Sequence, residues 1–253
     1  FYKYLLLVGF FLIMNPIIGQ STDTMKGNVK MKTYNYADTL LLDFYTVQTD
    51  TFKMKPTIIL VHGGGFTAGQ RNGGDEKGIS TYLAKLGFNV ASIDYRLSRK
   101  GKSFGCDCAA SIKMNTYTEA VADLSKAINY LTKEEKPFQV DSSKIFLIGS
   151  SAGAETVLNL KDSVVPYGTN AHRYCATTDV GYLNLNGPKS IAERLSDLDG
   201  NFKVYNSEEG GHEWASLGFD FPELISQFIE QVLNGEATMR DFETINSTVE
   251  IKE

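Results

Sequence analysis

The chain has 253 residues, of which 42% are hydrophobic and 22% charged, so it is long enough for one large domain with a sizeable core. Its formal net charge of −5 argues against nucleic acid as a main partner, because phosphate binding needs clustered Lys and Arg side chains. The composition also argues against a disordered or fibrous chain.

The first nineteen residues, FYKYLLLVGFFLIMNPIIG, carry one Lys followed by an apolar run from Tyr4 to Met14. A positive start, a short apolar run and a small residue at the exit are typical of a secretory signal, and we expect cleavage after Gly19. The run is short for a bilayer span, although a retained membrane anchor stays an alternative. We therefore expect a signal peptide at residues 1–19 and a secreted or periplasmic protein with no stable membrane span after cleavage.

Strand and helix patterns alternate along the rest of the chain. Residues 31–47 predict two antiparallel strands, and the continuous apolar run at 57–61, which ends in glycines, predicts a strand buried on both faces. In chain order, we expect a helix at 74–88, a strand at 89–97, a helix at 115–134, a strand at 144–150, a helix at 190–200, a strand at 201–207 and a helix at 221–235. This alternation predicts a mostly parallel sheet flanked by helices in one domain at residues 20–236, followed by a polar tail at 237–253.

The segment HGGGF at residues 62–66 follows the first buried strand. Acyl transfer builds negative charge on the former carbonyl oxygen, and backbone N–H groups can stabilise that charge when glycines let the main chain approach closely. We expect the N–H groups of Gly64 and Gly65, together with that of Ala152, to form an oxyanion hole. His62 is expected to orient the loop and not to act as a base.

The segment Gly149-Ser150-Ser151-Ala152-Gly153 places a glycine two residues before and two residues after Ser151. This is the spacing of a nucleophile elbow, a sharp strand-to-helix turn in which side chains at the two glycine positions would collide with neighbouring backbone. The segment follows the apolar run KIFLIG and precedes the helix-forming AGAETVL, which is the context that the motif requires. We expect Ser151, and not Ser150, to be the nucleophile.

A serine hydroxyl is a weak nucleophile until a base removes its proton. The chain has three histidines. His212 lies in NSEEGGHEWAS, after an expected strand and ahead of the final helix, where the chain order Ser, acid, His places the base. His172 lacks such a setting, and we expect a surface or structural role for it.

These motifs resemble those of carboxylesterases of the α/β-hydrolase superfamily, in particular the hormone-sensitive-lipase-like and bacterial secreted esterase groups. The matching pieces are VHGGGF, IDYRL, GSSAGAE, DSVVPYG and GGHEW, spread over residues 55–235. The resemblance implies an α/β-hydrolase fold and ester hydrolysis with Ser151 as nucleophile, His212 as base and Asp162 as acid. It implies no metal and no organic cofactor.

Asp162 follows Ser151 by eleven residues, whereas the family places further strand and helix units between nucleophile and acid. If the chain from Ala152 is helical, eleven residues at about 1.5 Å each put Asp162 roughly 16 Å along the helix axis. A strand at 157–161 would need a parallel crossover of about a dozen residues, and only six are available. We therefore expect a fold shortened near 157–163, lacking one or two strands, with its activity in doubt. The alternative acids are Asp179, Glu208 and Glu209.

The three cysteines, Cys106, Cys108 and Cys175, are an odd number for an exported protein. One pair can be bridged, but the sequence does not choose the pair, and Cys106 with Cys108 would strain disulfide geometry. The Cys-x-Cys spacing is a weak sign of a metal site, because no His lies near it at ligand spacing.

The first functional hypothesis is a secreted serine esterase that forms an acyl-enzyme on a small-molecule or polysaccharide-linked ester. Acetyl or feruloyl esters of carbohydrate are preferred on the resemblance alone. The alternatives are a catalytically impaired or silent hydrolase-like protein, and a serine peptidase or lipase of the same fold. The sequence leaves the oligomeric state open.

Overall fold

A computed structural model of the chain describes residues 28–47, 54–133, 138–160, 175–184, 193, 202–207, 221–235 and 240–245. The expected signal segment at 1–19 lies outside the described residues, as do Asp162, His172, Glu208, Glu209 and His212.

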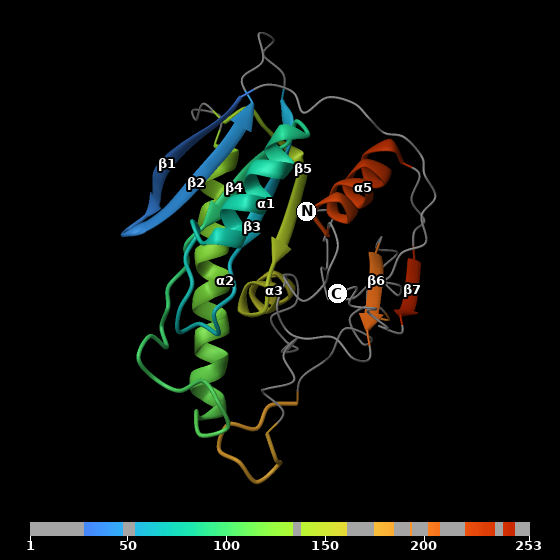
Figure 1. Ribbon diagram of the computed structural model, residues 1–253. Helices are drawn as coiled ribbons and strands as arrows, with labels where there is room; N and C mark the ends of the chain where they lie inside the picture. Colours follow the sequence, from blue (N-terminus) through green and yellow to red (C-terminus); the bar gives the residue numbers. More distant parts are fainter. Residues whose placement is uncertain are drawn as a thin grey trace, which may run out of the picture.

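Five strands form one mixed sheet in the order β1-β2-β4-β3-β5 (Figure 1). Their bounds are Val29–Ala37 (β1), Leu40–Val47 (β2), Lys55–Val61 (β3), Asn89–Ile93 (β4) and Val140–Gly149 (β5). β1 and β2 form an antiparallel hairpin, and β2 also runs antiparallel to β4. β3 lies between β4 and β5 and is parallel to both. The expected hairpin and parallel strands are confirmed.

The central strand β3 is buried on both faces of the sheet. Its residues Ile58, Ile59, Leu60 and Val61 are each at most 1% exposed. Ile58 and Leu60 belong to one apolar cluster and Ile59 and Val61 to another, because successive side chains of a strand point to opposite faces. This two-sided burial explains why the sequence shows a continuous apolar run there.

Helices cover both faces of the sheet (Figure 1). Their bounds are Gly74–Lys85 (α1), Ala110–Thr132 (α2), Ala152–Asn159 (α3) and Phe221–Asn234 (α5). Buried residues of α1 and α5 share one apolar cluster with the sheet, and those of α2 and α3 share the other. The expected sheet with flanking helices is therefore confirmed.

Helix α2 begins five residues before the start that the sequence predicts, at Ala110 instead of residue 115. No side chain caps this end, but the Ala110 N–H donates to the carbonyl of Val180 at 2.9 Å. A backbone group from far along the chain thus satisfies one of the free N–H groups of the first turn. Local sequence patterns do not reveal such a partner.

Strands β6 (Phe202–Ser207) and β7 (Arg240–Ile245) pair in parallel with each other, in a sheet separate from the larger one. β6 matches the strand expected at 201–207. β7 lies within the expected polar tail at 237–253, where the sequence predicts no strand. Its sequence RDFETI is short and half charged, which gives a weak strand signal. Pairing with β6 supplies hydrogen-bond partners along one edge of β7.

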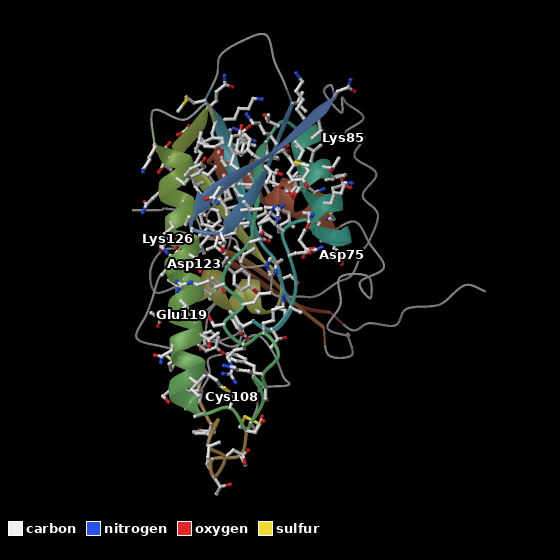
Figure 2. All side chains as sticks on the ribbon, turned by 90° about the vertical axis from the view of Figure 1, so that its left-hand side faces the viewer. Asp75, Lys85, Cys108, Glu119, Asp123 and Lys126 are labelled. Atoms are coloured by element: carbon white, nitrogen blue, oxygen red, sulfur yellow. A yellow bond between two sulfur atoms is a disulfide. The ribbon has the colours of Figure 1, made fainter. Side chains whose placement is uncertain are left out.

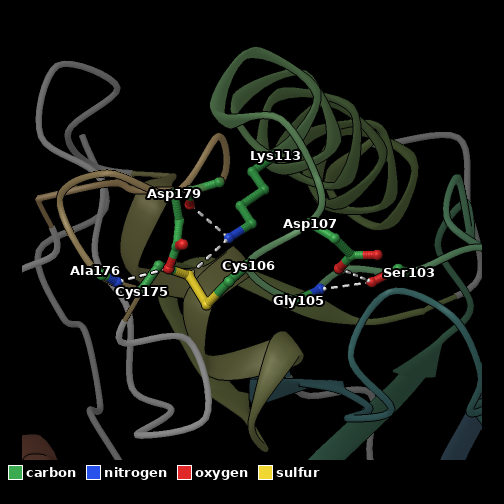
Figure 3. Close-up of a disulfide and its surroundings, with 9 residues drawn as sticks. Ser103, Gly105, Cys106, Asp107, Lys113, Cys175, Ala176 and Asp179 are labelled. Carbon is green, nitrogen blue, oxygen red and sulfur yellow. Dashed lines mark hydrogen bonds between the residues drawn. A yellow bond between two sulfur atoms is a disulfide. The ribbon is translucent and has the colours of Figure 1, made fainter.

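A disulfide joins Cys106 to Cys175 (Figure 3). Cys108 is a buried free thiol. Sixty-nine residues separate the bridged cysteines in sequence, so the bond fixes the 175–184 segment beside the start of α2. Lys113 of α2 supports the same junction, because its Nζ donates to the Gly181 carbonyl at 2.7 Å and lies 3.6 Å from the Cys175 sulfur.

Arg96, which follows β4, links helix α2 to the sheet through an ion pair with Asp123. Asp123 of α2 is fully buried, and its carboxylate accepts hydrogen bonds from Nε and Nη2 of Arg96, at 2.7 and 2.9 Å. Glu119 and Lys126 lie along the same helix (Figure 2). The Arg96 main-chain N–H also donates to Asp123, at 3.1 Å, so the pair fixes both the side chain and the backbone after the strand.

Within the described residues, no helix combines the length and the apolar character that crossing a bilayer requires.

Candidate active site

Ser151 lies at the sharp turn between β5 and α3, as the sequence predicts. β5 ends at Gly149 and α3 begins at Ala152, so the whole change of direction takes place within two residues. Ser151 has φ 49° and ψ −116°, a conformation that a residue with a side chain rarely adopts. Such backbone strain persists only where the surrounding structure enforces it, and it concentrates at functional sites.

The glycines on either side of the turn are required by packing. A Cβ on Gly149 would lie 2.3 Å from the carbonyl carbon and oxygen of Gly153. A Cβ on Gly153 would lie 2.1 Å from the Val61 carbonyl oxygen of the neighbouring strand β3. Both distances are far shorter than a carbon atom allows. The geometry therefore confirms the steric reason for the glycine spacing around Ser151.

The loop between β3 and α1, residues 62–73, is called the glycine loop below. Gly64 has φ 107°, Gly65 has φ 63° and Phe66 has φ 62°, so three successive residues occupy a region that favours glycine. The Phe66 ring is fully buried and contacts the rings of Tyr95, Phe104 and Tyr117. This aromatic packing holds a bulky residue in a conformation that it would not adopt by itself.

The hydrogen bonds of the glycine loop fix the direction of its N–H groups. The Gly64 carbonyl accepts from the N–H groups of Thr67 and Ala68, at 3.1 and 3.0 Å, and from the Thr67 hydroxyl. In a trans peptide the N–H points away from the C=O, so the Gly65 N–H is directed out of this turn. The Gly63 carbonyl forms a hydrogen bond with the His62 side chain. The Gly64 N–H belongs to the same peptide unit, so it points away from that carbonyl.

The N–H group of Ala152 is the third expected donor. Ala152 is the first residue of α3, and the first N–H groups of a helix have no partner within the helix. The helix dipole adds partial positive charge at this end, which favours a developing anion. Among the described residues, none of the hydrogen bonds between backbone groups uses the N–H of Gly64, Gly65 or Ala152 as donor.

The glycine loop and the serine turn are in direct contact. The Ser150 N–H donates to the Val61 carbonyl at 3.2 Å, immediately before the loop begins. A Cβ placed on Gly63 would lie 3.4 Å from Cβ of Ser151, at van der Waals distance. The structure therefore brings the candidate nucleophile beside the loop that carries the candidate oxyanion donors.

His62 is buried inside the loop and holds it in place. Its Nδ1 lies 2.6 Å from the Gly63 carbonyl oxygen, which can only accept, so Nδ1 carries the proton. The imidazole stacks on the ring of Tyr95 at 4.4 Å, and the Tyr95 hydroxyl donates to the His62 carbonyl at 3.0 Å. Burial lowers the pKa of His62, which outweighs the opposing effects of the Gly63 hydrogen bond and of Asp94. These contacts support the orienting role that the sequence suggests.

Sequence reasoning did not identify Arg71, which lies near the end of the glycine loop and forms ion pairs with Asp43 of β2 and Asp94 after β4. The partners lie 28 and 23 residues away in the sequence, in β2 and directly after β4, and only the fold reveals that these two strands pair. The only signal in the sequence is that Asp94 belongs to the IDYRL motif.

The other expected members of the site are placed as follows. Asp162 and His212 lie outside the described residues, so their distances from Ser151 are not part of the observed geometry. Helix α3 runs to Asn159, which excludes a strand beginning at Val157. Asp179, an alternative acid, lies beside the disulfide, where its carboxylate accepts from the Ala176 N–H at 2.7 Å (Figure 3).

One group of potential metal ligands occurs among the described residues, formed by Cys106, Cys175 and Asp179. The two sulfurs are joined to each other, so they are not thiolates that could bind a cation.

Residues 42–161 match the BD-FAE family. The isoprenylcysteine alpha-carbonyl methylesterase ICME of Arabidopsis thaliana is 25% identical over 203 residues, which make up 79% of this chain and 39% of that protein. A probable isoprenylcysteine alpha-carbonyl methylesterase, ICMEL1, of Oryza sativa subsp. japonica is 32% identical over 113 residues, 45% of this chain and 23% of that protein. The chain thus spans about two fifths of the first relative's length and about a quarter of the second's.

Among solved structures, MGS-M1, an alpha/beta hydrolase enzyme from a Medee basin deep-sea metagenome library, is similar to the chain with a TM-score of 0.50 and 15% identity. The similarity covers 87% of this chain and 82% of that one. It supports the fold that the mixed sheet and its flanking helices already indicate. The chain therefore has the α/β-hydrolase fold, and its residues 42–161, which include both the glycine loop and the serine turn, match the BD-FAE family.

Proposed function

We propose that the chain hydrolyses carboxylic esters through an acyl-enzyme on Ser151. The Ser151 oxygen attacks the ester carbonyl carbon while His212 takes the hydroxyl proton. The bond to the alkoxy group then breaks, and the alcohol leaves with that proton. Water attacks the acyl-enzyme in the same way, releases the carboxylic acid and restores the serine hydroxyl.

The observation that carries this proposal is the contact between the strained serine turn and the glycine loop. Ser151 has a positive φ and lies, half-buried, at the tip of a sharp strand-to-helix turn. The N–H groups of Gly64 and Gly65 are oriented by carbonyls that point the other way. Donors fixed in advance stabilise the oxyanion because they need no rearrangement during the reaction, and each contributes roughly 10²- to 10³-fold to kcat.

His212 and Asp162 are proposed as the base and the acid that orients it. Asp162 follows the end of α3 by three residues, which motivates the competing proposal of an impaired or silent hydrolase. An absent acid lowers the rate without abolishing it, because the base and the oxyanion donors still act.

Labelling with a fluorophosphonate probe tests the nucleophile. We expect stoichiometric labelling of the wild-type chain, loss of labelling in Ser151→Ala, and full labelling in Ser150→Ala, which removes the neighbouring hydroxyl as a matched control. Labelling that survives Ser151→Ala would refute the proposal.

Turnover of p-nitrophenyl acetate separates the esterase from the silent hydrolase. We expect His212→Ala to reduce turnover by roughly 10⁴-fold or more and Asp162→Asn by less. A wild-type chain that folds but shows no turnover would favour the silent protein.

We further propose a substrate with a short or carbohydrate-linked acyl group, such as an acetyl or feruloyl ester. The support is the lack of a long amphipathic insertion between the sequence motifs, which argues against a lipase lid. The ICME relatives are named as methylesterases, so a small alcohol group is a second candidate. A panel of acetyl, feruloyl, methyl and long-chain esters, with a peptide substrate included, distinguishes these from a lipase or peptidase.

We also propose that the protein is secreted or periplasmic. The disulfide between Cys106 and Cys175 supports this, because such bonds persist in oxidising compartments. Expression of the gene in its host should give a processed product whose first residue follows Gly19. A product that is retained unprocessed in the membrane fraction would indicate an anchor instead.

A further inference from the structure

We propose that Arg71 is a positioning residue that holds the end of the glycine loop, and through it the oxyanion donors, in the geometry that the reaction requires. The inference rests on the proposed esterase function, because it assigns a role within the same site. The side chain of Arg71 pairs with Asp43 and Asp94, and in this proposal Arg71 acts through the loop.

Arg71 is fastened to two strands by contacts from its side chain and its main chain. Its main-chain N–H donates to Oδ1 of Asp94 at 2.9 Å, and its Nη1 donates to Oδ2 of the same carboxylate at 2.7 Å. Its Nε lies 3.0 Å from Oδ1 of Asp43. Its carbonyl accepts from the Ser92 hydroxyl at 2.7 Å. Backbone and side chain are therefore both fixed at one residue.

The partners of Arg71 lie in a strand of the sheet or directly after one. Asp43 lies in the middle of β2, is 1% exposed and also accepts a hydrogen bond from Thr33 of β1 at 2.6 Å. Asp94 follows β4 directly. A guanidinium presents several donors in a fixed plane and can bind both carboxylates at once, whereas a lysine ammonium offers a single charged centre. This arrangement specifies an arginine at position 71.

The glycine loop needs an anchor at each end because its glycines allow many backbone conformations. His62 anchors its start through the Gly63 carbonyl, and the Arg99 N–H holds the Phe66 carbonyl at 3.2 Å. Arg71 anchors the other end of the loop, next to α1. If that end is released, the N–H groups of the loop lose their fixed direction and the stabilisation of the oxyanion weakens.

Two variants test this role. Arg71→Lys keeps the positive charge and removes the planar set of donors. The double variant Arg71→Met with Asp43→Asn removes the guanidinium without leaving the buried Asp43 charge unpaired, so it stays informative if a single Arg71→Met variant fails to fold. Both are compared with the wild type at a temperature well below their thermal transitions.

Asn89→Ala is the matched control. Asn89 begins β4, at the opposite end of the strand from Asp94, and it is 1% exposed. Its amide donates to the Phe138 carbonyl at 2.9 Å, and its oxygen accepts from Thr46 at 2.7 Å. Its replacement removes a buried polar network from the same strand but leaves the glycine loop untouched. It therefore reports the effect of lower stability alone.

For the double variant we expect kcat for p-nitrophenyl acetate to fall by about 10- to 100-fold with less than about threefold change in KM, and the rate of fluorophosphonate labelling to fall in parallel. Arg71→Lys should retain an intermediate rate, and Asn89→Ala should stay within about twofold of the wild type. Hydrogen exchange of residues 62–73 should be faster in both Arg71 variants and unchanged in Asn89→Ala.

The positioning role and the esterase activity fail in distinguishable ways. If the wild type reacts but the Arg71 variants slow no more than Asn89→Ala, the positioning role is wrong while the esterase proposal stands. Faster exchange without slower reaction also overturns the positioning role, because the anchor would then be structural only. If the folded wild type neither turns over ester nor reacts with the probe, the esterase proposal fails, and the inference about Arg71 fails with it.

Discussion

The serine turn and the glycine loop both hold residues at positive φ, but they do so by different means. In the serine turn, the backbone of neighbouring elements leaves no room for a side chain at Gly149 or Gly153. In the glycine loop, a side chain at Gly69 would also clash, and hydrogen bonds and ion pairs from His62 and Arg71 hold the chain in addition. Steric exclusion fixes a turn within a few residues, whereas polar anchoring depends on distant partners. The serine turn should therefore be sensitive to added volume, and the glycine loop to lost contacts as well as to added volume.

The largest effect is expected for Gly153→Ala. The added Cβ would lie 2.1 Å from the Val61 carbonyl oxygen, so strand β3 and helix α3 must separate. We expect a loss of about 3 kcal/mol or more, a fall in Tm of roughly 6–12 °C, and no labelling of Ser151. Thermal unfolding, monitored by circular dichroism, measures the change in Tm.

Gly78→Ala is the control for this change. Gly78 lies within α1, and a Cβ there has no atom within 4 Å, so alanine should be neutral or stabilising by up to about 1 kcal/mol. Equal behaviour of the two variants would show that crowding at the serine turn is not what fixes it.

Gly69→Ala should disturb the glycine loop while leaving the fold intact. Gly69 has φ 95°, and its Cβ would lie 2.3 Å from the Gly63 carbonyl oxygen and 2.4 Å from Nδ1 of His62. The hydrogen bond between these two atoms must break, which releases the Gly64 N–H. We expect kcat for p-nitrophenyl acetate to fall by roughly 10²-fold.

Gly87→Ala controls for backbone strain in that experiment. Gly87 has φ 103° but open space around its Cβ position. Its replacement should reduce stability by about 1–2 kcal/mol and leave kcat unchanged. If Gly87→Ala lowers kcat as much as Gly69→Ala, general strain, and not the clash with His62, is responsible.

The same contrast, between local steric exclusion and contacts with distant partners, explains how well the sequence predicts each region. The spacing of Gly149 and Gly153 around Ser151 reports a local steric demand, so a short motif is enough to find it. Arg71, the early start of α2 and the choice of Cys175 as the partner of Cys106 all depend on segments brought together by the fold. β3 and β5 are predictable because continuous apolar runs reflect burial on both faces, whereas the charged β7 gives no such signal.

His62→Asn should weaken the loop less than Gly69→Ala, because the asparagine amide can still donate to the Gly63 carbonyl while the stacking on Tyr95 is lost. We expect kcat to fall by roughly 10-fold. The variant should also change the pH dependence of stability. Burial lowers the pKa of His62 below its ordinary value of 6.5, so His62 contributes stability that is present above that value and lost as the pH falls through the folded-state pKa.

Denaturant unfolding between pH 7.5 and pH 5 measures this contribution as the difference between wild type and His62→Asn. Asp94 raises the His62 pKa and is retained in both proteins, and the other histidines are common to both. The wild type should lose more stability than the variant over this interval. Parallel curves would show that His62 is not held neutral by the fold.

The smallest effect is expected for Tyr95→Phe. The Tyr95 hydroxyl donates to the His62 carbonyl at 3.0 Å, while the ring stacks on the imidazole and contacts Phe66. Phenylalanine keeps both ring contacts and removes one buried hydrogen bond, so we expect a loss of about 1 kcal/mol in stability and a fall in kcat of no more than about fivefold. Combined with His62→Asn, it should add less than its separate effect, because both changes loosen the same end of the glycine loop. A double variant whose losses are fully additive would mean that Tyr95 and His62 hold the loop independently.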